Sequence, residues 1–434
     1  MKTIPLRPVP PVPATAPRPA AAVDTRWRLA RLSSAPHRLG FFAAAVLLSI
    51  SGLWWALALG ARYGGVLLPW AVPALVAHAL VMSMSFMPLF IVGFLFTAGP
   101  KWLGLPDVPG SSLVRPVLLL SGGWLLALPG FHLWAPLAGA GMAVSALGWG
   151  MLMWRLLRLL RASPAPDKLH ATGVAVAGSV GLLAMVAGAV AVTLGDVALA
   201  RAAAQLSLWG FLAPTFTIVS HRMLPFFTAS ALPFLDAWRP NWLLWVMLAV
   251  LGVRGAGAVA DLLWWPLPAV WRWAQVAVEA PAAALMLWLA VRWGLVQSLK
   301  IRLLAMLHGG FVWLGLALAL AAVSHAGLAL GGEGLGLAPT HALSMGYLGC
   351  TLIAMITRVA SGHSGRPLAA DNLAWTLYWG VQAATLLRVG AALWPAGESP
   401  LVLLAVAAWA VAGTGWAWRY GGWLGRPRAD GRPG

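Results

Sequence analysis

The stretch VPALVAHALVMSMSFMPLFIVGFLFTA, residues 72–98, contains no Asp, Glu, Lys or Arg. A helix rises about 1.5 Å per residue, so about 20 apolar residues cover the roughly 30 Å hydrocarbon core of a bilayer. The stretch is long enough to cross a membrane, and it predicts a transmembrane helix.

Similar apolar blocks follow one another along the whole chain. The 434 residues are 61% hydrophobic and only 9% charged, whereas about a quarter of the residues in a soluble domain are charged. The sequence lacks the ten-residue alternation of apolar and polar residues that is typical of outer-membrane barrels. We therefore expect an all-α, polytopic integral membrane protein of twelve helices, over residues 39–59, 72–98, 113–130, 131–155, 170–194, 198–219, 241–262, 267–291, 301–325, 340–358, 373–394 and 399–418.

The basic residues orient these helices. With a cytoplasmic N-terminus, all but five of the 29 Lys and Arg residues fall on the cytoplasmic side. This asymmetry follows the positive-inside rule, so we expect both termini in the cytoplasm. The net charge of +18 then reflects membrane topology, and a nucleic-acid-binding function is excluded because no folded domain gathers the charge. The expected partner is the lipid bilayer. The five exceptions are Arg62, Arg201, Arg254, Arg272 and Arg388.

Two terminal segments lack apolar blocks. Residues 1–38 are basic and rich in Pro and Ala, a composition typical of a disordered tail. Residues 420–434 are also basic and predicted to be disordered, so the membrane domain is predicted over residues 39–419. The single cysteine, Cys350, excludes an intrachain disulfide or a cysteine-ligated cluster.

Two similar pentapeptides place histidines near the outer ends of helices. HALVM (78–82) and HALSM (341–345) each put a methionine four residues after a histidine, on the same helical face. Imidazole is a common ligand of haem iron, and thioether suits copper(I). We predict that His78 and His341, with Met82 and Met345, hold a cofactor. The alternative is that they make only polar contacts between helices, with methionine filling gaps.

Three other histidines, His221, His308 and His363, lie toward the cytoplasmic side. Because they belong to different predicted spans or follow one, they could converge on one copper ion. Arg366, three residues after His363, could bind a haem propionate or another carboxylate as a fork. The alternative is that His363 and Arg366 only cap and solvate a loop.

Glu279 is the acidic residue nearest the middle of the bilayer, within the span 267–291. An ionisable residue at that depth is a candidate proton-handling group. The alternative is an ion pair with Arg254 or Arg272 that only fixes helix packing.

Four stretches resemble the NnrS family of bacterial membrane proteins: GFLFTAGPKW (93–102), HRMLPFFT (221–228), LHGGFVWLGLAL (307–318) and HALSMGYLGCTLIAMITRVASGHSGRPL (341–368). The resemblance implies a multi-pass inner-membrane protein that contains haem b and copper. It also implies a role in the nitrogen-oxide response, in association with denitrification and protection from nitrosative stress, with nitric oxide as the expected ligand.

One position departs from the family pattern. Members typically carry H-x-H-E-M in the second span, whereas this chain has Leu80 and Val81 in place of the second His and the Glu. His78 and Met82 match the motif, so the chain lacks two groups that typical members hold there.

Other classes of membrane protein share the number of spans. A secondary transporter or exporter without a metal is the alternative function, although the sequence shows no symmetric halves or broken helices. A haem–copper oxidase or nitric-oxide reductase core is excluded because it needs adjacent histidines and a His-Pro motif, and the sequence has no His-His or His-Pro pair. No catalytic motif is recognised, so enzymatic activity stays open.

Overall fold

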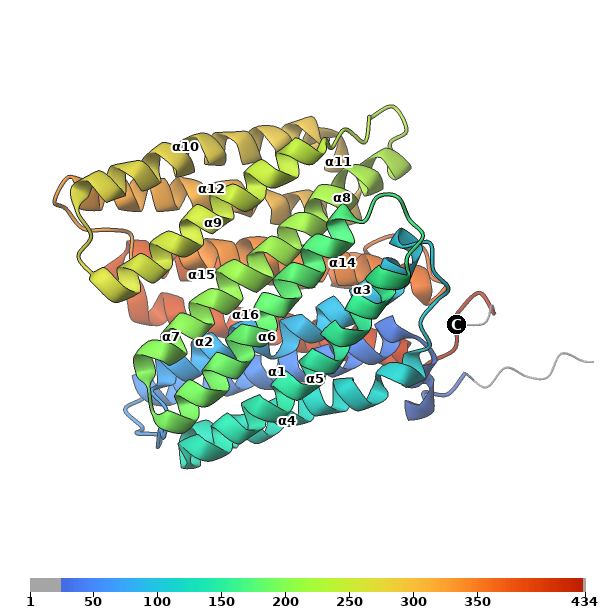
Figure 1. Cartoon of the computed structure of the whole chain (residues 1–434), viewed down its shortest axis with the longest axis horizontal. Helices are drawn as coiled ribbons and strands as arrows, with labels where there is room; N and C mark the ends of the chain where they lie inside the picture. Colours follow the sequence, from blue (N-terminus) through green and yellow to red (C-terminus); the bar gives the residue numbers. More distant parts are fainter. Residues whose placement is uncertain (1–24, 432–434) are drawn as a thin grey trace, which may run out of the picture.

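A computed structural model describes residues 25–431, which are helical and contain no β-strand. Twelve long rods lie side by side in one bundle (Figure 1). The rods are α1 (Pro36–Tyr63), α2–α3 (Ala74–Met84, Phe86–Trp102), α4 (Val114–Leu133), α5 (Ala135–Ala162), α6 (Leu169–Leu194), α7–η3–α8 (Val197–Leu206, Ser207–Leu212, Ala213–Ala231), α9 (Asn241–Trp264), α10 (Ala269–Arg292), α12 (Arg302–Ala329), α13–η4–α14 (Ala338–His341, Ala342–Gly349, Cys350–His363), α15 (Asn372–Leu393) and α16 (Glu398–Leu424).

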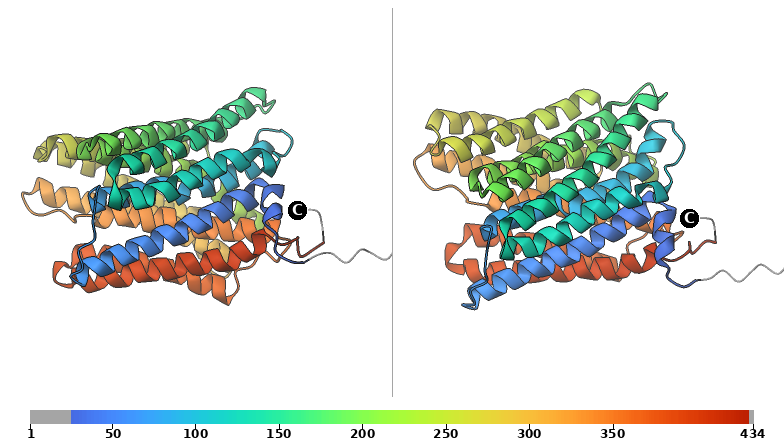
Figure 2. Two further views of the ribbon diagram at one scale, coloured as in Figure 1. Left: turned by 90° about the horizontal axis from the view of Figure 1, so that it is seen from below. Right: turned by 60° about the horizontal axis from the view of Figure 1, so that its bottom comes forward.

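Short helical turns occupy some of the connections. They are η1 (Leu29–Ser34), η2 (Gly110–Leu113), α11 (Leu295–Ser298) and η5 (Pro395–Gly397). Figure 2 shows in two further views that the rods run roughly parallel or antiparallel along one direction.

Eleven of the described rods are long and apolar enough to cross a membrane, which confirms the prediction of an all-α, polytopic membrane protein. The rod missing from these eleven is α15, the predicted eleventh span. Its hydropathy is lowered by polar residues such as Gln382 and Thr385, whose side chains are buried in the bundle. Because α15 packs along α16 and next to α14, it is part of the bundle despite its composition.

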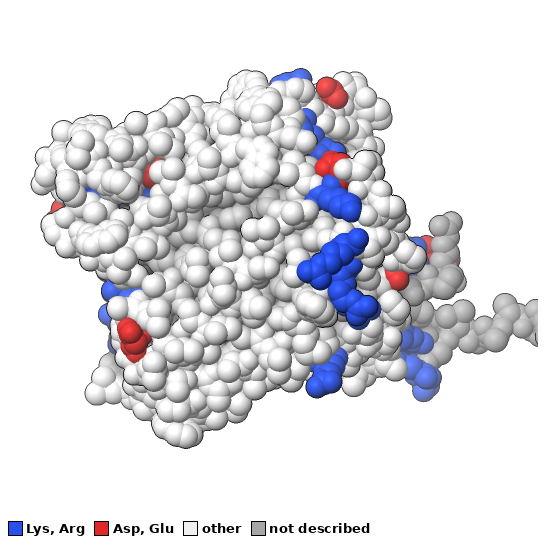
Figure 3. Space-filling view, in the orientation of Figure 1, with Lys and Arg blue, Asp and Glu red and all other residues white. Residues whose placement is uncertain are grey.

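Both described ends of the chain lie at one end of the bundle. The backbone N–H of Arg28 donates to the carbonyl of Gly425 at 2.9 Å. We call this the proximal end and the opposite one the distal end. In Figure 3 the Lys and Arg side chains gather mainly at the proximal end, on the right, and the broad middle of the visible face carries almost no charge. Leu57 and Val411 are among the apolar side chains exposed along the rods, as expected of surfaces that face lipid.

Several predicted boundaries are wrong. The predicted span 198–219 continues as α8 to Ala231, because His221 and Thr228 are buried against neighbouring helices instead of ending the rod at the interface. The junction between the predicted spans 113–130 and 131–155 lies at Trp134, whose backbone is extended between α4 and α5.

The predicted terminal segments also need correction. Helix α16 runs to Leu424, past the predicted boundary at 419, and the N–H of Ala429 donates to the carbonyl of Ser364 at 2.9 Å. At the other end η1 begins at Leu29 and α1 at Pro36, within the predicted tail. The rest of that tail, residues 1–24, lies outside the described residues.

Three rods are interrupted within the bundle, which the sequence analysis did not detect. Ser85 breaks α2 from α3, and the segments η3 and η4 are π-helical. A π-helical segment widens the turn and shifts the side chains that follow, and such segments are frequent at functional sites. Segment η4 begins directly after His341, so it follows one of the predicted ligands.

Glycines allow close crossings between rods, as the composition indicated. A Cβ atom on Gly40 of α1 would lie 2.6 Å from the backbone nitrogen of Gly93 on α3. A side chain there would push the two helices apart, so small residues set the distance between these rods.

Candidate functional site

Six of the nine histidines form three pairs, each between two different helices. One pair is at the distal end, and two are toward the proximal end. The pairs are His78 with His341, His37 with His363, and His170 with His221. Each pair offers two imidazoles from elements that are far apart in sequence.

The distal pair joins α2 to the end of α13. His78 and His341 lie within electrostatic reach of each other and of Arg388 on α15. Both side chains are half-buried. The predicted approach of the two outer histidines within ligand-bridging distance stays a prediction.

Hydrogen bonding leaves the distal imidazoles with unused nitrogens. His341 Nδ1 donates to the Leu337 carbonyl at 3.1 Å, so its Nε2 carries the lone pair. This is the usual arrangement of a histidine that ligates a metal through Nε2. His78 stacks on Trp55, with ring centroids 4.1 Å apart and planes at 25°. Its Nδ1 is buried without a hydrogen-bond partner among the described residues.

The two methionines of the outer prediction lie one turn further along the same rods. Met82 is half-buried and packs against the apolar core of the bundle. Met345 is also half-buried and lies within the π-helical segment η4. Both thioethers are thus near the distal pair in sequence and depth.

The proximal pair brings together the beginning of α1 and the end of α14. The ring centroids of His37 and His363 are 4.4 Å apart, and the planes are inclined by 36°. His37 is buried, and its Nδ1 has no partner among the described residues. Lys101, Arg38 and Arg428 lie within electrostatic reach of His363. This pair therefore sits in a strongly basic environment.

Hydrogen bonds define the tautomers of the third pair, His170 and His221. His221 Nε2 donates to the Pro240 carbonyl at 3.2 Å, so its Nδ1 accepts the proton of His170 Nε2 at 3.0 Å. The remaining nitrogen, His170 Nδ1, is then an unprotonated acceptor, and it is buried without a partner among the described residues. Because metal–imidazole bonds are about 2 Å long, a metal could bind both nitrogens, now 3.0 Å apart, only after the rings move apart.

The predicted convergence of His221, His308 and His363 on one copper ion is wrong. No group of three His, Cys, Asp or Glu residues that could hold a metal occurs within residues 25–431. His308 Nε2 instead donates to Thr228 Oγ1 at 3.0 Å, because the Thr228 hydroxyl hydrogen is directed to the Leu224 carbonyl. His308 is level with Thr228, which lies seven residues from His221 on α8, about 10 Å along the helix.

Glu279 is fully buried in a compact cluster of α9, α10 and α12. Arg254 Nη1 donates to Glu279 Oε1 at 2.9 Å, and His325 Nδ1 donates to Glu279 Oε2 at 2.9 Å. Arg254 Nη1 also lies 3.4 Å from His325 Nε2. Both carboxylate oxygens are occupied, and one cation balances one anion. The geometry favours the ion pair with Arg254, since Arg272 pairs with Asp261.

Arg366 follows the end of α14 and lies over the indole ring of Trp423, with Cζ 4.3 Å from the ring centroid. Burial, together with the nearby cations Arg426 and Arg419, lowers the pKa of its guanidinium. Its Nη1 has no hydrogen-bond partner among the described residues.

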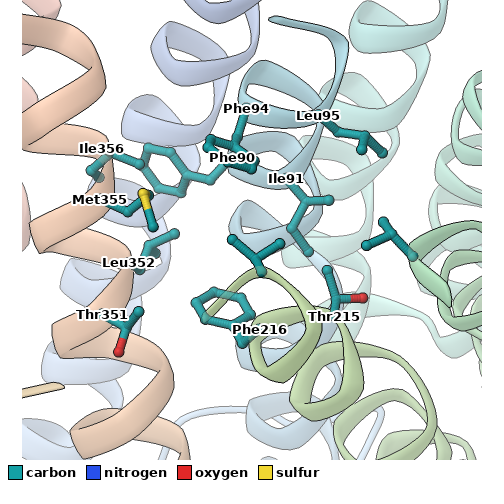
Figure 4. A pocket seen from close by; sticks show the side chains of 12 residues that line it. Phe90, Ile91, Phe94, Leu95, Thr215, Phe216, Thr351, Leu352, Met355 and Ile356 are labelled. Carbon is teal, nitrogen blue, oxygen red and sulfur yellow. The ribbon is translucent and has the colours of Figure 1, made fainter. Parts of the chain in front are cut away.

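A small apolar cavity lies between the two levels of histidines (Figure 4). It is bounded by α3, α6, α8 and α14 and lined mainly by aliphatic and aromatic side chains. Figure 4 shows the Thr351 hydroxyl directed away from the other labelled side chains. The cavity therefore offers space for an apolar group but no polar ligand.

Sequence reasoning missed four residues that complete these sites. The sequence did not pair His37 or His170 with another histidine, and it did not associate Arg388 and Trp55 with His78. Depth along a helix identifies residues at the same level. It does not reveal which helices are neighbours, so no sequence feature identified the partners.

Residues 31–428 match the sequence model of a family described as NnrS protein. The match covers nearly the whole chain, and the chain therefore belongs to the NnrS family. No curated protein matches the chain.

Proposed function

We propose that this member of the NnrS family is a haem- and copper-binding protein that binds nitric oxide in the nitrogen-oxide response and protects cells from nitrosative stress. The observation that carries the proposal is the distal pair, because two imidazoles on separate rods lie within electrostatic reach of each other and each has an unused nitrogen. Family membership supports the nitric-oxide part of the proposal.

The residues at the distal pair fit a haem. His78 and His341 would hold the haem, and neutral imidazole is a common ligand of its iron. The cation of Arg388, within electrostatic reach of both, would balance the charge of a propionate. Met82 and Met345 would supply apolar, polarisable surface beside the macrocycle.

A bound haem would supply an iron that coordinates nitric oxide. The chain itself would orient that centre. The Leu337 carbonyl holds the ring of His341 in one tautomer, and Trp55 covers one face of the His78 ring. Ala77, Leu80 and Val81, close to His78 along α2, are buried in the bundle.

Copper is better accommodated by the His170–His221 pair than by the predicted trio. His170 and His221, whose rings meet at the printed hydrogen bond, would hold the copper, since neutral imidazoles suit this metal. The Pro240 carbonyl already fixes the orientation of His221. The chain would thus hold haem and copper at opposite ends of the bundle.

The location that best fits this function is the bacterial inner membrane, with the proximal end in the cytoplasm. The gathering of Lys and Arg at the proximal end supports that orientation. A reporter that is active only in the periplasm should give no signal when it is fused to the C-terminus, and activity there would reverse the orientation.

The alternative of a secondary transporter receives one supporting observation, the interruptions at Ser85, η3 and η4. Transporters use broken helices to expose backbone groups and half-helix ends around a central substrate site. Here the region between the rods is filled by Phe216, Tyr347 and Phe311, whose rings contact one another. We therefore favour the cofactor-binding function.

The decisive experiment is the absorption spectrum and haem content of the purified full-length protein, before and after addition of nitric oxide. We expect a Soret band that shifts with nitric oxide. His78→Ala and His341→Ala should each lower bound haem at least about tenfold, because loss of one ligand typically costs more than the 10–100-fold seen for second-shell changes. His132→Ala is the matched control, since His132 lies at the same end but bonds Trp54 and the Pro69 carbonyl.

A colourless wild-type protein would instead support transport. Copper is quantified on the same samples. His170→Ala and His221→Ala should lower copper without changing haem, and His308→Ala serves as the control because His308 is another buried histidine toward the proximal end. Unchanged copper in both pair variants would remove the proposed copper site.

A further inference from the structure

Two arginines and one tryptophan form a cluster at the proximal end that the proposed function does not use. Arg366 lies after α14, and Arg419 and Trp423 belong to the last turns of α16. Both guanidiniums lie over the same indole ring, with Cζ atoms 4.3 and 5.1 Å from the ring centroid. We call these three residues the Arg–Trp cluster.

The Arg–Trp cluster carries more positive charge than its neighbours balance. Arg419 pairs with Asp371, which is half-exposed at the beginning of α15. Arg366 has no ion pair within the described part of the chain, and Arg426 is a further cation within electrostatic reach. Asp430, the other nearby carboxylate, is engaged by Arg428. The cations at the Arg–Trp cluster therefore outnumber the carboxylates near them, and the cluster could accept an anion.

The unused donors are specific atoms. Arg366 Nη1 and Arg419 Nε are both buried without a hydrogen-bond partner among the described residues. Buried donors are normally satisfied by protein or by a bound group. The planar guanidinium presents its remaining N–H groups in a fork that matches the oxygens of a phosphate. The indole ring holds both forks in place through cation–π contacts.

The surroundings of the Arg–Trp cluster are amphipathic. Leu368, two residues after Arg366, and Trp418, next to Arg419, are exposed large apolar side chains. Tryptophan is enriched where apolar chains meet headgroups. Basic pockets between helices at this level bind anionic lipid headgroups. A phosphate placed on the arginines would have apolar side chains beside it for an attached acyl chain.

We propose that Arg366, Arg419 and Trp423 form a binding site for a phosphate group at the proximal membrane interface. The group comes either from an anionic phospholipid or from free phosphate. The site is separate from the distal histidine pair, and it does not depend on the presence of haem.

Binding is tested by native mass spectrometry of the full-length protein in detergent, with three probes. They are dioleoyl phosphatidylglycerol, dioleoyl phosphatidylcholine and inorganic phosphate. We expect phosphatidylglycerol to bind more tightly than phosphatidylcholine. Each substitution, Arg366→Gln or Arg419→Gln, should weaken phosphatidylglycerol binding about fivefold, the effect expected for one basic residue at the membrane surface.

Arg158→Gln is the matched control, because Arg158 is an exposed arginine toward the same end, on α5. It should change binding less than twofold. Arg366→Lys should keep part of the affinity, since it retains the charge, and it replaces the glutamine variant if that variant fails to fold.

Other results would identify a different ligand or overturn the site. Competition by inorganic phosphate without any preference between the two lipids would identify free phosphate as the source. Equal binding of both lipids with no effect of phosphate, or undiminished binding after both substitutions, would overturn the site. Loss of haem from the double variant with phosphatidylglycerol binding intact would also overturn it, and would assign Arg366 to a propionate. Haem content should therefore stay unchanged.

Discussion

Two histidine sites near the distal end differ in the hydrogen bonding of their imidazole nitrogens. In the cluster of α9, α10 and α12, His325 bonds Glu279 and lies next to Arg254, so both ring nitrogens have partners. In the distal pair, one nitrogen of His341 is held by a carbonyl, and Nδ1 of His78 is buried without a partner among the described residues.

The difference distinguishes side chains that stabilise the bundle from histidines whose unused nitrogens are available to a ligand. A satisfied buried network contributes to stability, and breaking it leaves an unpaired charge. An imidazole with an unused nitrogen contributes little to folding and is available to a metal. We therefore expect the cost in stability to decrease from the Glu279 cluster to the distal pair, while the cost in bound cofactor increases.

Glu279→Ala should have the largest effect on stability. It leaves the buried Arg254 without its counter-charge, so the free energy of unfolding should fall by about 3–5 kcal/mol. Tryptophan fluorescence during denaturant unfolding in detergent measures the change. The double variant Arg254→Leu with Glu279→Leu should recover most of the loss. A Glu279→Ala protein as stable as the wild type would contradict a structural role for the cluster.

His325→Ala should have an intermediate effect. It removes one donor from Glu279 but leaves the arginine–carboxylate pair, so the loss should be about 1–3 kcal/mol, the range for one unsatisfied buried partner. The same unfolding measurement applies. A loss as large as that of Glu279→Ala would show that the imidazole carries a charge that the cluster needs.

His132→Ala tests a satisfied histidine nearer the surface. Trp54 Nε1 donates to His132 Nε2 at 2.8 Å, and His132 Nδ1 donates to the Pro69 carbonyl at 2.8 Å. Their loss should cost about 1 kcal/mol, because solvent replaces part of the bonding. Trp54→Phe, which removes only the indole donor, should cost less. Haem content should stay at the wild-type level in both variants.

His341→Ala should have the smallest effect on stability. It removes one hydrogen bond from a half-buried side chain, so cofactor-free protein should lose about 0.5 kcal/mol, the lower end for a single bond. The same variant should lose most of its bound haem. Unfolding midpoints and haem content from one preparation compare both quantities. A stability loss in the range of Glu279→Ala, with haem retained, would reverse the comparison.

Sequence patterns predicted much of this architecture. Apolar blocks located the rods, and the positions of Lys and Arg separated the two ends. The rise per residue then assigned each histidine to a level, and the shared level of His78 and His341 led to their predicted proximity. Both histidines are at the distal end because each lies near the beginning of a rod, and the two rods run in the same direction.

The same reasoning failed where lateral position mattered. His221 and His308 hydrogen-bond to His170 and Thr228, and His363 contacts the ring of His37. The boundary of α8 was also missed, because polar residues resemble a helix end in sequence but are buried in the bundle. In a membrane helix, apolar residues occupy both the lipid-facing and the core-facing sides, so periodicity does not identify neighbours.

The sequence by itself determined the class of protein, the approximate rods and the end of the bundle nearest to most ionisable residues. These properties follow from one-dimensional quantities: hydrophobic length, charge distribution and helical rise. Only the tertiary structure decided which histidines pair, which nitrogens stay unused and that Glu279 meets Arg254. The reason is that helix order and rotation in a bilayer are set by side-chain packing and polar contacts between rods, which depend on all neighbours at once.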